Sequence, residues 1–170
     1  GKWGVAVDGY IDWSPRYYQI WDLFFNPDGT TLYALGAPKY GKWTVIENDR
    51  PWKTTFRDMV TDLSISPDGT RAAFIGKDKG RYAVTVDDVR SKGWFDMAWK
   101  PVFSHDSKHV ATKVERAGGK FTYMINGKLY PRDFDLLWDP VFSPDNDKVL
   151  IRAIDNQAFI RIVAPVSDFE

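Results

Sequence analysis

The chain has 170 residues, 44% of them hydrophobic and 16% aromatic, which supports a folded core and excludes disorder as its main state. Lys plus Arg and Asp plus Glu balance at 23 each, so no global positive field draws the chain to nucleic acid or an anionic membrane. The lack of cysteine excludes disulfides, Fe–S ligation and thiol catalysis within it.

Apolar runs are short throughout the sequence. None approaches the roughly 18 residues needed to cross a bilayer, and the first thirty residues lack the order of charged, apolar and small residues that marks a signal peptide. We therefore expect no cofactor, no nucleic-acid partner and no direct membrane span. The sequence opens on Gly1-Lys2-Trp3 without an initiator Met, so we expect a fragment of a longer protein.

A Gly-Lys-aromatic motif recurs along the chain. Its aromatic residue returns at steps of 40, 39, 39 and 38 residues, the last copy being degenerate. A constant interval of this size is typical of stacked repeats. The copies are Gly1-Lys2-Trp3, Gly41-Lys42-Trp43, Gly80-Arg81-Tyr82, Gly119-Lys120-Phe121 and Gln157-Ala158-Phe159.

A Ser-Pro-Asp-Gly type turn recurs in phase with that motif, at steps of 40, 38 and 39 residues. Pro presets φ for a turn, Asp accepts backbone hydrogen bonds, and Gly takes the left-handed conformation that leads into a strand. The copies that lack Pro or Gly are expected to form weaker turns. The four copies are Asn26-Pro27-Asp28-Gly29, Ser66-Pro67-Asp68-Gly69, Ser104-His105-Asp106-Ser107 and Ser143-Pro144-Asp145-Asn146.

A second hairpin is predicted in each module. Asp8-Gly9 and Asn126-Gly127 favour the turn types that match strand twist, whereas Asn48-Asp49 and Asp87-Asp88 suit this place less well. Alternating apolar residues and the lack of any 3.6-residue period predict strands around these turns.

About four short strands per module of roughly 39 residues predict an all-β fold, a β-propeller with one four-stranded blade per module. A β-sandwich is the alternative, but it does not require one motif to return at a constant interval. The chain is then a single propeller segment over residues 1–170, with modules at about 1–40, 41–79, 80–118 and 119–156 and a partial one at 157–170.

The two ends of the chain both fall on the third strand of a blade, at Trp3 and at Phe159 to Val163. A closed four-bladed ring leaves one of these strands without a place, so we expect an incomplete ring or a fragment of a larger propeller. Its open edges and blade faces predict self-association, as in a homodimer that completes the ring.

A tryptophan stands five positions before the turn in three modules and is followed by a charged residue. This is where the chain enters the innermost strand, near the face that receives ligands in propellers. A partner-binding ring is one interpretation, and packing between blades is the favoured alternative, because it also recurs once per blade. The partner-binding candidates are Trp21, Asp22, Trp99, Lys100, Trp138 and Asp139, and the second module has Thr61 and Asp62 in their place.

Other chemistry-bearing residues favour structural roles. His105 and His109 straddle a turn, so their spacing does not bring both rings to one zinc ion. The carboxylates of Asp87-Asp88 and of Asp133 and Asp135 have no converging partners in the sequence. Without a nucleophile elbow, a phosphate loop or a metal triad, we expect no enzyme, no catalytic residue and no metal site.

One stretch is distinctly basic and contains two aromatic residues, Tyr82 and Trp94. It could face an acidic partner or phospholipid head groups, but acidic neighbours dilute it, and an ordinary solvated surface is the favoured interpretation. The basic residues are Lys77, Lys79, Arg81, Arg90 and Lys92.

The Ser-Pro-Asp-Gly hairpins with Gly-Lys-aromatic strands resemble WD40-like and TolB-like propeller repeats. Longer segments resemble the C-terminal part of TmcD-type subunits, the propeller subunits of the transmembrane tetrahaem-cytochrome electron-transfer complex of sulfate-reducing bacteria. This resemblance implies a cofactor-free subunit on the cytoplasmic side, held at the membrane by partner subunits. The segments are 37–45, 95–104, 138–145 and 148–154.

These features together predict a non-catalytic scaffold that docks other protein subunits within a membrane-associated electron-transfer complex of anaerobic sulfate respiration. A periplasmic TolB-like binding module is the alternative from another compartment. A propeller enzyme with its site at the central opening is the third hypothesis, and its residues would have to meet from different blades.

Overall fold

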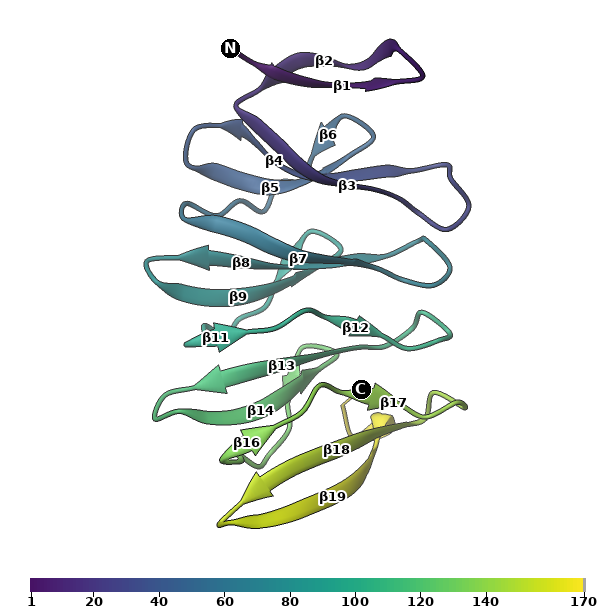
Figure 1. Cartoon of the computed structure of the whole chain (residues 1–170). Helices are drawn as coiled ribbons and strands as arrows, with labels where there is room; N and C mark the ends of the chain where they lie inside the picture. Colours follow the sequence, from purple (N-terminus) through teal and green to yellow (C-terminus); the bar gives the residue numbers. More distant parts are fainter. Residues whose placement is uncertain (170) are drawn as a thin grey trace.

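A computed structural model describes residues 1–169, which form nineteen strands in five antiparallel sheets and one turn of 3₁₀ helix, η1 (Val166–Phe169). The sheets follow one another along the chain and stack face to face (Figure 1). We number the four larger sheets as blades 1 to 4 and call the short sheet that precedes them the N-terminal sheet.

The strands occur in the same order in every blade, from the inner strand outward. The N-terminal sheet has β1 (Trp3–Val7) and β2 (Tyr10–Tyr17). Blade 1 has β3 (Gln19–Phe25), β4 (Leu32–Lys39), β5 (Lys42–Glu47) and β6 (Arg50–Pro51). Blade 2 has β7 (Met59–Ile65), β8 (Ala72–Asp78), β9 (Arg81–Val86) and β10 (Val89–Arg90).

The inner strands of the last two blades are divided. Blade 3 has β11 (Met97–Ala98) and β12 (Val102–Phe103), which both pair with β13 (Val110–Arg116), then β14 (Lys120–Ile125) and β15 (Lys128–Leu129). Blade 4 has β16 (Leu136–Leu137) and β17 (Val141–Phe142), which both pair with β18 (Lys148–Asp155), then β19 (Ala158–Pro165).

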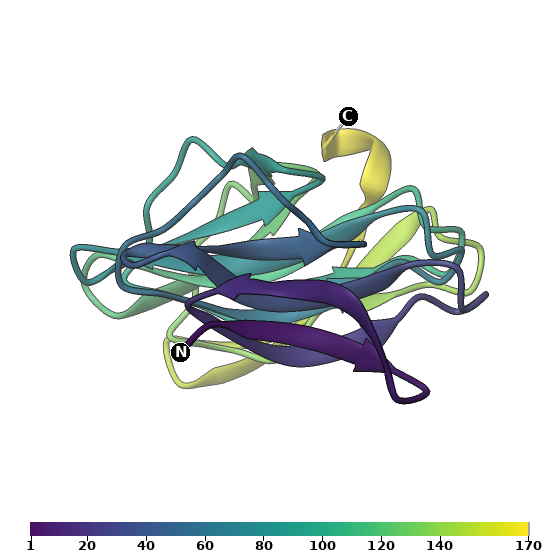
Figure 2. The same cartoon turned by 90° about the horizontal axis from the view of Figure 1, so that it is seen from above.

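The predicted β-propeller fold is confirmed, and the described chain forms an open arc of it. The N-terminal sheet and blade 4 lie at opposite ends of the stack in Figure 1 and do not meet. Seen from above, the sheets overlie one another with a progressive twist (Figure 2). Each sequence module covers the outer half of one blade and the inner half of the next, as 41–79 contains β5 to β8.

The hydrophobic core lies between neighbouring sheets. Between blades 1 and 2, for example, Leu35 and Val45 of blade 1 belong to the same buried cluster as Phe56 and Phe74. Phe56 packs edge-on against Phe74 with 5.8 Å between ring centroids. A Cβ at position 76 would lie 2.2 Å from the Phe56 ring, so only glycine fits there.

The Ser-Pro-Asp-Gly turns join the first and second strands of each blade. The Asp carboxylate accepts hydrogen bonds within its own turn, as when the Ser66 hydroxyl donates to Asp68 over 2.6 Å. That bond and the Thr70 backbone N–H lower the pKa of Asp68 to about 2. The same arrangement lowers the pKa of Asp106, chiefly through the Ser104 hydroxyl.

Hydrogen bonds also link each of these turns to the next, and at least one joins the two turns at every blade interface. The Asn26 side chain donates to the Gly69 carbonyl (3.5 Å), the Asp68 N–H donates to the Ser107 hydroxyl (3.0 Å), and the His105 N–H donates to the Asn146 side chain (2.8 Å). We call this series the turn ladder.

The turns that lack Pro or Gly keep the conformation of the complete turns, and their predicted weakness stays a prediction. Ser107 and Asn146 adopt φ of 66° and 65° where Gly29 and Gly69 have 75°, so they keep the turn conformation. In addition, their side chains accept the inter-blade bonds, and His105 supplies an N–H that proline lacks. The substitutions lose the backbone preference that Pro or Gly gives to a turn, and they gain a hydrogen bond to the turn of a neighbouring blade.

The second hairpins form as predicted, and the less ideal ones carry a further contact. Asn48-Asp49 and Asp87-Asp88 take positive φ at both residues, as Asn126-Gly127 does. The Asp88 carboxylate accepts the backbone N–H groups of 53 and 54, in the connection from blade 1 to blade 2, at 2.9 and 2.8 Å. Asp88, which stands where the corresponding hairpin of blade 3 has Gly127, therefore holds the connection from blade 1 to blade 2 in place.

Candidate functional site

The predicted partner-binding residues lie where the innermost strand of each blade is interrupted. In blades 1 and 2 the interruption is a bulge, and Asp22 and Asp62 take positive φ of 49° and 56° within it. Bulges of this kind re-aim side chains and are common beside binding sites. The innermost strands thus turn a charged residue outward once per blade.

Proline makes the interruption a full break in blades 3 and 4. Pro101 and Pro140 follow Trp99-Lys100 and Trp138-Asp139, and neither ring has an N–H to donate to the neighbouring strand. The backbone N–H groups of Trp99 and Trp138 still donate to the second strand, to the carbonyls of Lys113 and Arg152, both at 3.0 Å. The strand resumes at β12 and β17.

The tryptophans pack within their own blades. Each lies against the aromatic residue of the Gly-Lys-aromatic motif, with ring centroids 5.6 to 5.8 Å apart. Trp21 also packs against the buried cluster between blades 1 and 2, so packing within a blade accompanies packing between blades there. Trp138 remains 37% exposed. The pairs are Trp21 with Trp43, Trp99 with Phe121 and Trp138 with Phe159.

Lys113 of β13 joins two of the candidates across a blade interface. Its ammonium lies 4.5 Å from the centre of the Trp99 ring and 3.2 Å from the Asp139 carboxylate of blade 4. The Lys113 side chain is only 14% exposed, whereas Asp139 is 72% exposed. Lys113 thus fixes Trp99 and Asp139 relative to each other and leaves one side of the carboxylate open to solvent.

A groove of about 500 Å³ runs along the inner strands of blades 2 and 3 and reaches Asp139 of blade 4. We call it the inner groove. Three of the six candidates line it, Trp99, Lys100 and Asp139, together with Asp62 from blade 2. Trp21, Asp22 and Trp138 are not among its lining residues, so the structure gathers half of the predicted ring into one site. The other lining residues are Ser64, Ile65, Pro67, Met97, Ala98, Pro101, Val102 and Phe103.

The inner groove offers binding groups of three kinds. Trp99 supplies an apolar wall, Lys100 an exposed ammonium, and Asp62 and Asp139 carboxylates on blades 2 and 4, the two neighbours of blade 3. A volume of this size is within the range of ligand sites, which combine an apolar lining with a few placed polar groups. The groove is suited to a peptide segment that carries both apolar and charged side chains.

Burial also shapes the backbone at this interface. The Tyr123 hydroxyl of β14 donates to the Trp138 carbonyl over 2.6 Å, and burial raises the pKa of Tyr123 above its ordinary value. Tyr123 thus remains a neutral donor at physiological pH. It holds the Trp138 backbone while leaving the tryptophan ring at the surface.

The remaining chemistry-bearing residues have structural partners. His109 Nδ1 lies 3.1 Å from the Asn126 side-chain amide, across from the predicted turn. Asp87 bonds to Arg71 and Asp88 to the backbone of 53–54, so these two carboxylates do not act as a pair. Within residues 1–169, no three His, Cys, Asp or Glu side chains are grouped to hold a metal ion.

Asp133 and Asp135 likewise belong to separate ion pairs. Asp133 accepts from the Arg116 guanidinium at 3.0 Å, and Asp135 pairs with Lys120. The Lys120 ammonium and the Asn156 N–H lower the pKa of Asp135. Neither carboxylate reaches the inner groove.

Lys113 is the residue of the site that the sequence analysis missed. Its signal was a charged residue inside a strand, between buried Thr112 and Val114. A lone lysine there predicts a side chain with a specific partner, but the partner, Asp139, is 26 positions away and on another blade.

In the described part of the chain, no helix has the length and apolar character that crossing a bilayer requires.

Three solved structures show how far the likeness to known proteins extends. TolB from Acinetobacter baumannii is 14% identical over 93% of this chain and 43% of its own, with a TM-score of 0.48. Hydrazine synthase from Kuenenia stuttgartiensis is 20% identical over 85% of this chain and 50% of its own, with a TM-score of 0.42. A protein described as a candidate 6-phosphogluconolactonase, from Bacteroides uniformis, is 14% identical over 87% and 56%, with a TM-score of 0.39.

The chain thus spans about half the length of these proteins. No curated protein matches its sequence. The sequence profile of the family described as the lipoprotein LpqB β-propeller domain (Gmad1) matches residues 14–115, which is more than half of the chain and covers blades 1 and 2 with most of β13. This chain belongs to the LpqB lipoprotein β-propeller domain family.

Proposed function

We propose that this chain is a non-catalytic binding module whose inner groove holds a segment of a protein partner. The observation that carries the proposal is the meeting of Trp99, Lys100 and Asp139, from two blades, in one open groove. Lys113 fixes two of them in advance, which reduces the entropy lost on binding.

The chemistry of the groove supports a peptide segment as the ligand. An aromatic anchor beside exposed charges of both signs is typical of protein interfaces, in which a few such residues supply most of the binding energy. A TolB-like binding module, the alternative drawn from the sequence, fits this arrangement and the family of the chain.

Site-specific photo-crosslinking tests this proposal. A p-benzoylphenylalanine at Lys100 should crosslink a partner from a membrane extract of the source cells, and excess unmodified protein should compete with it. Lys42, an exposed lysine outside the groove, is the matched position. An Asp139→Lys change should abolish the crosslink at position 100, whereas equal crosslinking at both positions would contradict the proposal.

The family description also supports a location. Because the family is named for a lipoprotein domain, we propose a location in the cell envelope, and the cytoplasmic location predicted from the sequence is the alternative that the experiment distinguishes. Immunoblots of fractionated cells measure this directly. Recovery in the cytoplasmic fraction alone would contradict an envelope location.

A docking role in a membrane electron-transfer complex is a narrower form of the same proposal. It is supported by the segments 95–104 and 138–145, which resemble TmcD-type subunits and contain the groove residues Trp99 and Asp139. Purification of the native complex tests it, because haem-containing subunits should accompany the chain. If they do not, the narrower form fails and the crosslinking experiment still decides the binding role.

Self-association is a separate proposal that rests on the two end faces. Tyr10 and Ile11 of β2 are 81% and 70% exposed, and Phe159 and Val163 of β19 also lie open. A second copy that covers these apolar side chains should bring the mass measured by light scattering above the 19.5 kDa of one chain. A monomer at all concentrations would contradict it.

A further inference from the structure

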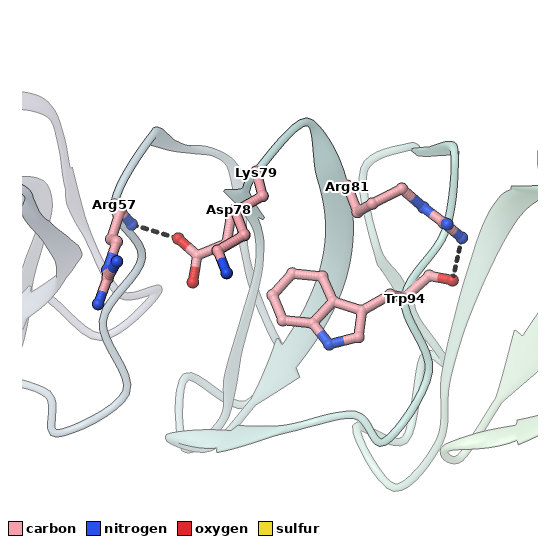
Figure 3. A pocket seen from close by; sticks show the side chains of 5 residues that line it. All are labelled: Arg57, Asp78, Lys79, Arg81 and Trp94. Carbon is pink, nitrogen blue, oxygen red and sulfur yellow. Dashed lines mark hydrogen bonds between the residues drawn. The ribbon is translucent and has the colours of Figure 1, made fainter.

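A second hollow, of about 530 Å³, lies at the other end of blade 2, beside the β8–β9 hairpin. We call it the hairpin pocket. It is lined by Arg57 from the connection before the blade, Asp78, Lys79 and Arg81 from the hairpin, and Trp94 from the connection after it. Figure 3 shows Arg57 on one side of the pocket and Trp94 on the other, with Asp78 between them.

The three cations of the hairpin pocket differ in what they already bind. Arg81 is engaged: its guanidinium donates to the Trp94 and Phe95 carbonyls at 2.8 and 3.1 Å and lies 3.1 Å from the Asp96 carboxylate. The Arg57 guanidinium and the Lys79 ammonium have no hydrogen-bond or ion-pair partner within residues 1–169.

The acidic residue of the pocket, Asp78, forms no ion pair with the Arg57 guanidinium or the Lys79 ammonium. One Asp78 oxygen accepts the Arg57 backbone N–H, a bond drawn in Figure 3, which fixes the carboxylate against the main chain. Asp58 is fixed in a similar way by the Gly80 N–H at 3.1 Å. Two cations at the pocket therefore remain available to an incoming anion.

The indole of Trp94 is held as a wall of the pocket. The Phe56 ring meets it edge-on with centroids 6.3 Å apart, and the Arg90 guanidinium lies 4.7 Å from its ring centre. Both contacts restrict the indole without removing it from the pocket lining. An apolar group on the ligand would thus meet a preformed surface.

The matching place on blade 3 carries an ion pair that blade 2 lacks, Arg116 with Asp133. The strand registers align Arg57, Asp78 and Trp94 with Asp96, Arg116 and Asp133. In blade 3, Arg116 binds Asp133 at 3.0 Å, and Lys120, the counterpart of Arg81, binds Asp135. Blade packing therefore does not require the open cations and the tryptophan of blade 2, since a blade of the same fold forms with opposite charges.

We propose that the hairpin pocket binds an acidic peptide segment, with a carboxylate between Arg57 and Lys79 and an adjacent apolar side chain against Trp94. Guanidinium groups bind carboxylates through paired hydrogen bonds, and a vacant ammonium beside one adds a second charge-assisted contact. The pocket is concave and is bordered by the carboxylates of Asp58, Asp78 and Asp96, which a flat anionic lipid surface would also have to approach. An inserted peptide carboxylate still meets Asp78, which lines the pocket, but it would contact the free Arg57 and Lys79 cations directly, whereas a flat surface would bring its charges near all three carboxylates.

Fluorescence anisotropy with a fluorescein-labelled peptide, Ser-Glu-Phe-Asp-Glu-Ser, tests the proposal on the intact chain. The double variant Arg57→Gln/Lys79→Gln should weaken binding at least about tenfold. Its matched control is Lys39→Gln/Lys42→Gln, which removes two exposed lysines from the corresponding hairpin of blade 1 and should change the Kd less than about twofold.

The other arms use different probes. The amide peptide Ser-Gln-Phe-Asn-Gln-Ser should not bind, and added salt should weaken the acidic peptide. Three results would overturn the proposal: no binding of the acidic peptide at millimolar concentration, equal loss in both double variants, or sedimentation with phosphatidylserine vesicles that depends on Arg57 and Lys79 while the peptide does not bind. Competition by inorganic phosphate as strong as by the peptide would also overturn it, since it would show that the indole wall contributes nothing.

Discussion

The two ends of the blades use their residues in different ways. At the turn ladder, each blade places an Asp in the same position, its carboxylate accepts hydrogen bonds within its own turn, and a hydrogen bond joins the turn to that of the next blade. At the opposite end, beside the β8–β9 and β13–β14 hairpins, equivalent positions carry opposite charges, as in Asp78 and Arg116. The recurring turn residues join neighbouring blades, whereas the residues that differ between blades 2 and 3 leave Arg57 and Lys79 open to a ligand.

The largest effect should come from the packing that every interface shares. Phe74 is fully buried and lies against Trp52 and Phe56, so Phe74→Ala should lower the free energy of unfolding by about 3–5 kcal/mol. Urea unfolding followed by circular dichroism measures the change. Trp138→Ala serves as the comparison: the ring is 37% exposed and should cost clearly less. Equal losses would contradict the division between core and surface aromatics.

A single bond of the turn ladder should have a smaller effect. Ser107→Ala should cost about 1 kcal/mol, because the Asp68 N–H loses its acceptor while φ at 107 stays positive. Ser107→Gly is the matched control, since it removes the same hydroxyl but relieves the positive φ. Its stability should fall between wild type and the Ala variant. The unfolding midpoints of the three proteins measure these differences. An Ala variant as stable as wild type would show that this bond of the turn ladder does not stabilise the fold.

The smallest effect concerns acid. The pKa of Asp68 is lowered from 3.8 to about 2, so the folded state favours the ionised form. Its contribution to stability is complete above the unfolded value and is lost as the pH falls through the folded value. Asp68→Asn should therefore be less stable than wild type at neutral pH, and the difference should vanish toward pH 2. A difference that does not change with pH would contradict the hydrogen-bonded carboxylate.

The repeat explains why the fold could be predicted from the sequence. Both markers have one period, and the turns at Asp28-Gly29 and Asp68-Gly69 have a local mechanism, so the blades follow from residues close together in the chain. The ladder could not be predicted in the same way. Ser107 and Asn146 look like defects within a turn, and their partners lie about one module away.

Only part of the inner groove could be predicted, because contacts between blades do not show in the sequence of one module. The spacing identified Trp99 and Asp139, but equal spacing also selected Trp21, which lies outside the groove. The groove depends on Lys113 and on the contact of two blades, which a module considered by itself does not contain. The hairpin pocket likewise needed Arg57, a residue outside the basic stretch that the sequence marks.

The turn ladder has a consequence for how the arc comes apart. Each of its bonds joins nearest neighbours only, so stability should behave as a chain of coupled units, with unfolding starting at the end blades and moving inward. Amide hydrogen exchange should then be fastest in the N-terminal sheet and blade 4 and slowest in β8. A ligand that stabilises blade 2 should also slow amide exchange in blades 1 and 3. Binding at one blade would then stabilise the neighbouring blades without a change in their conformation.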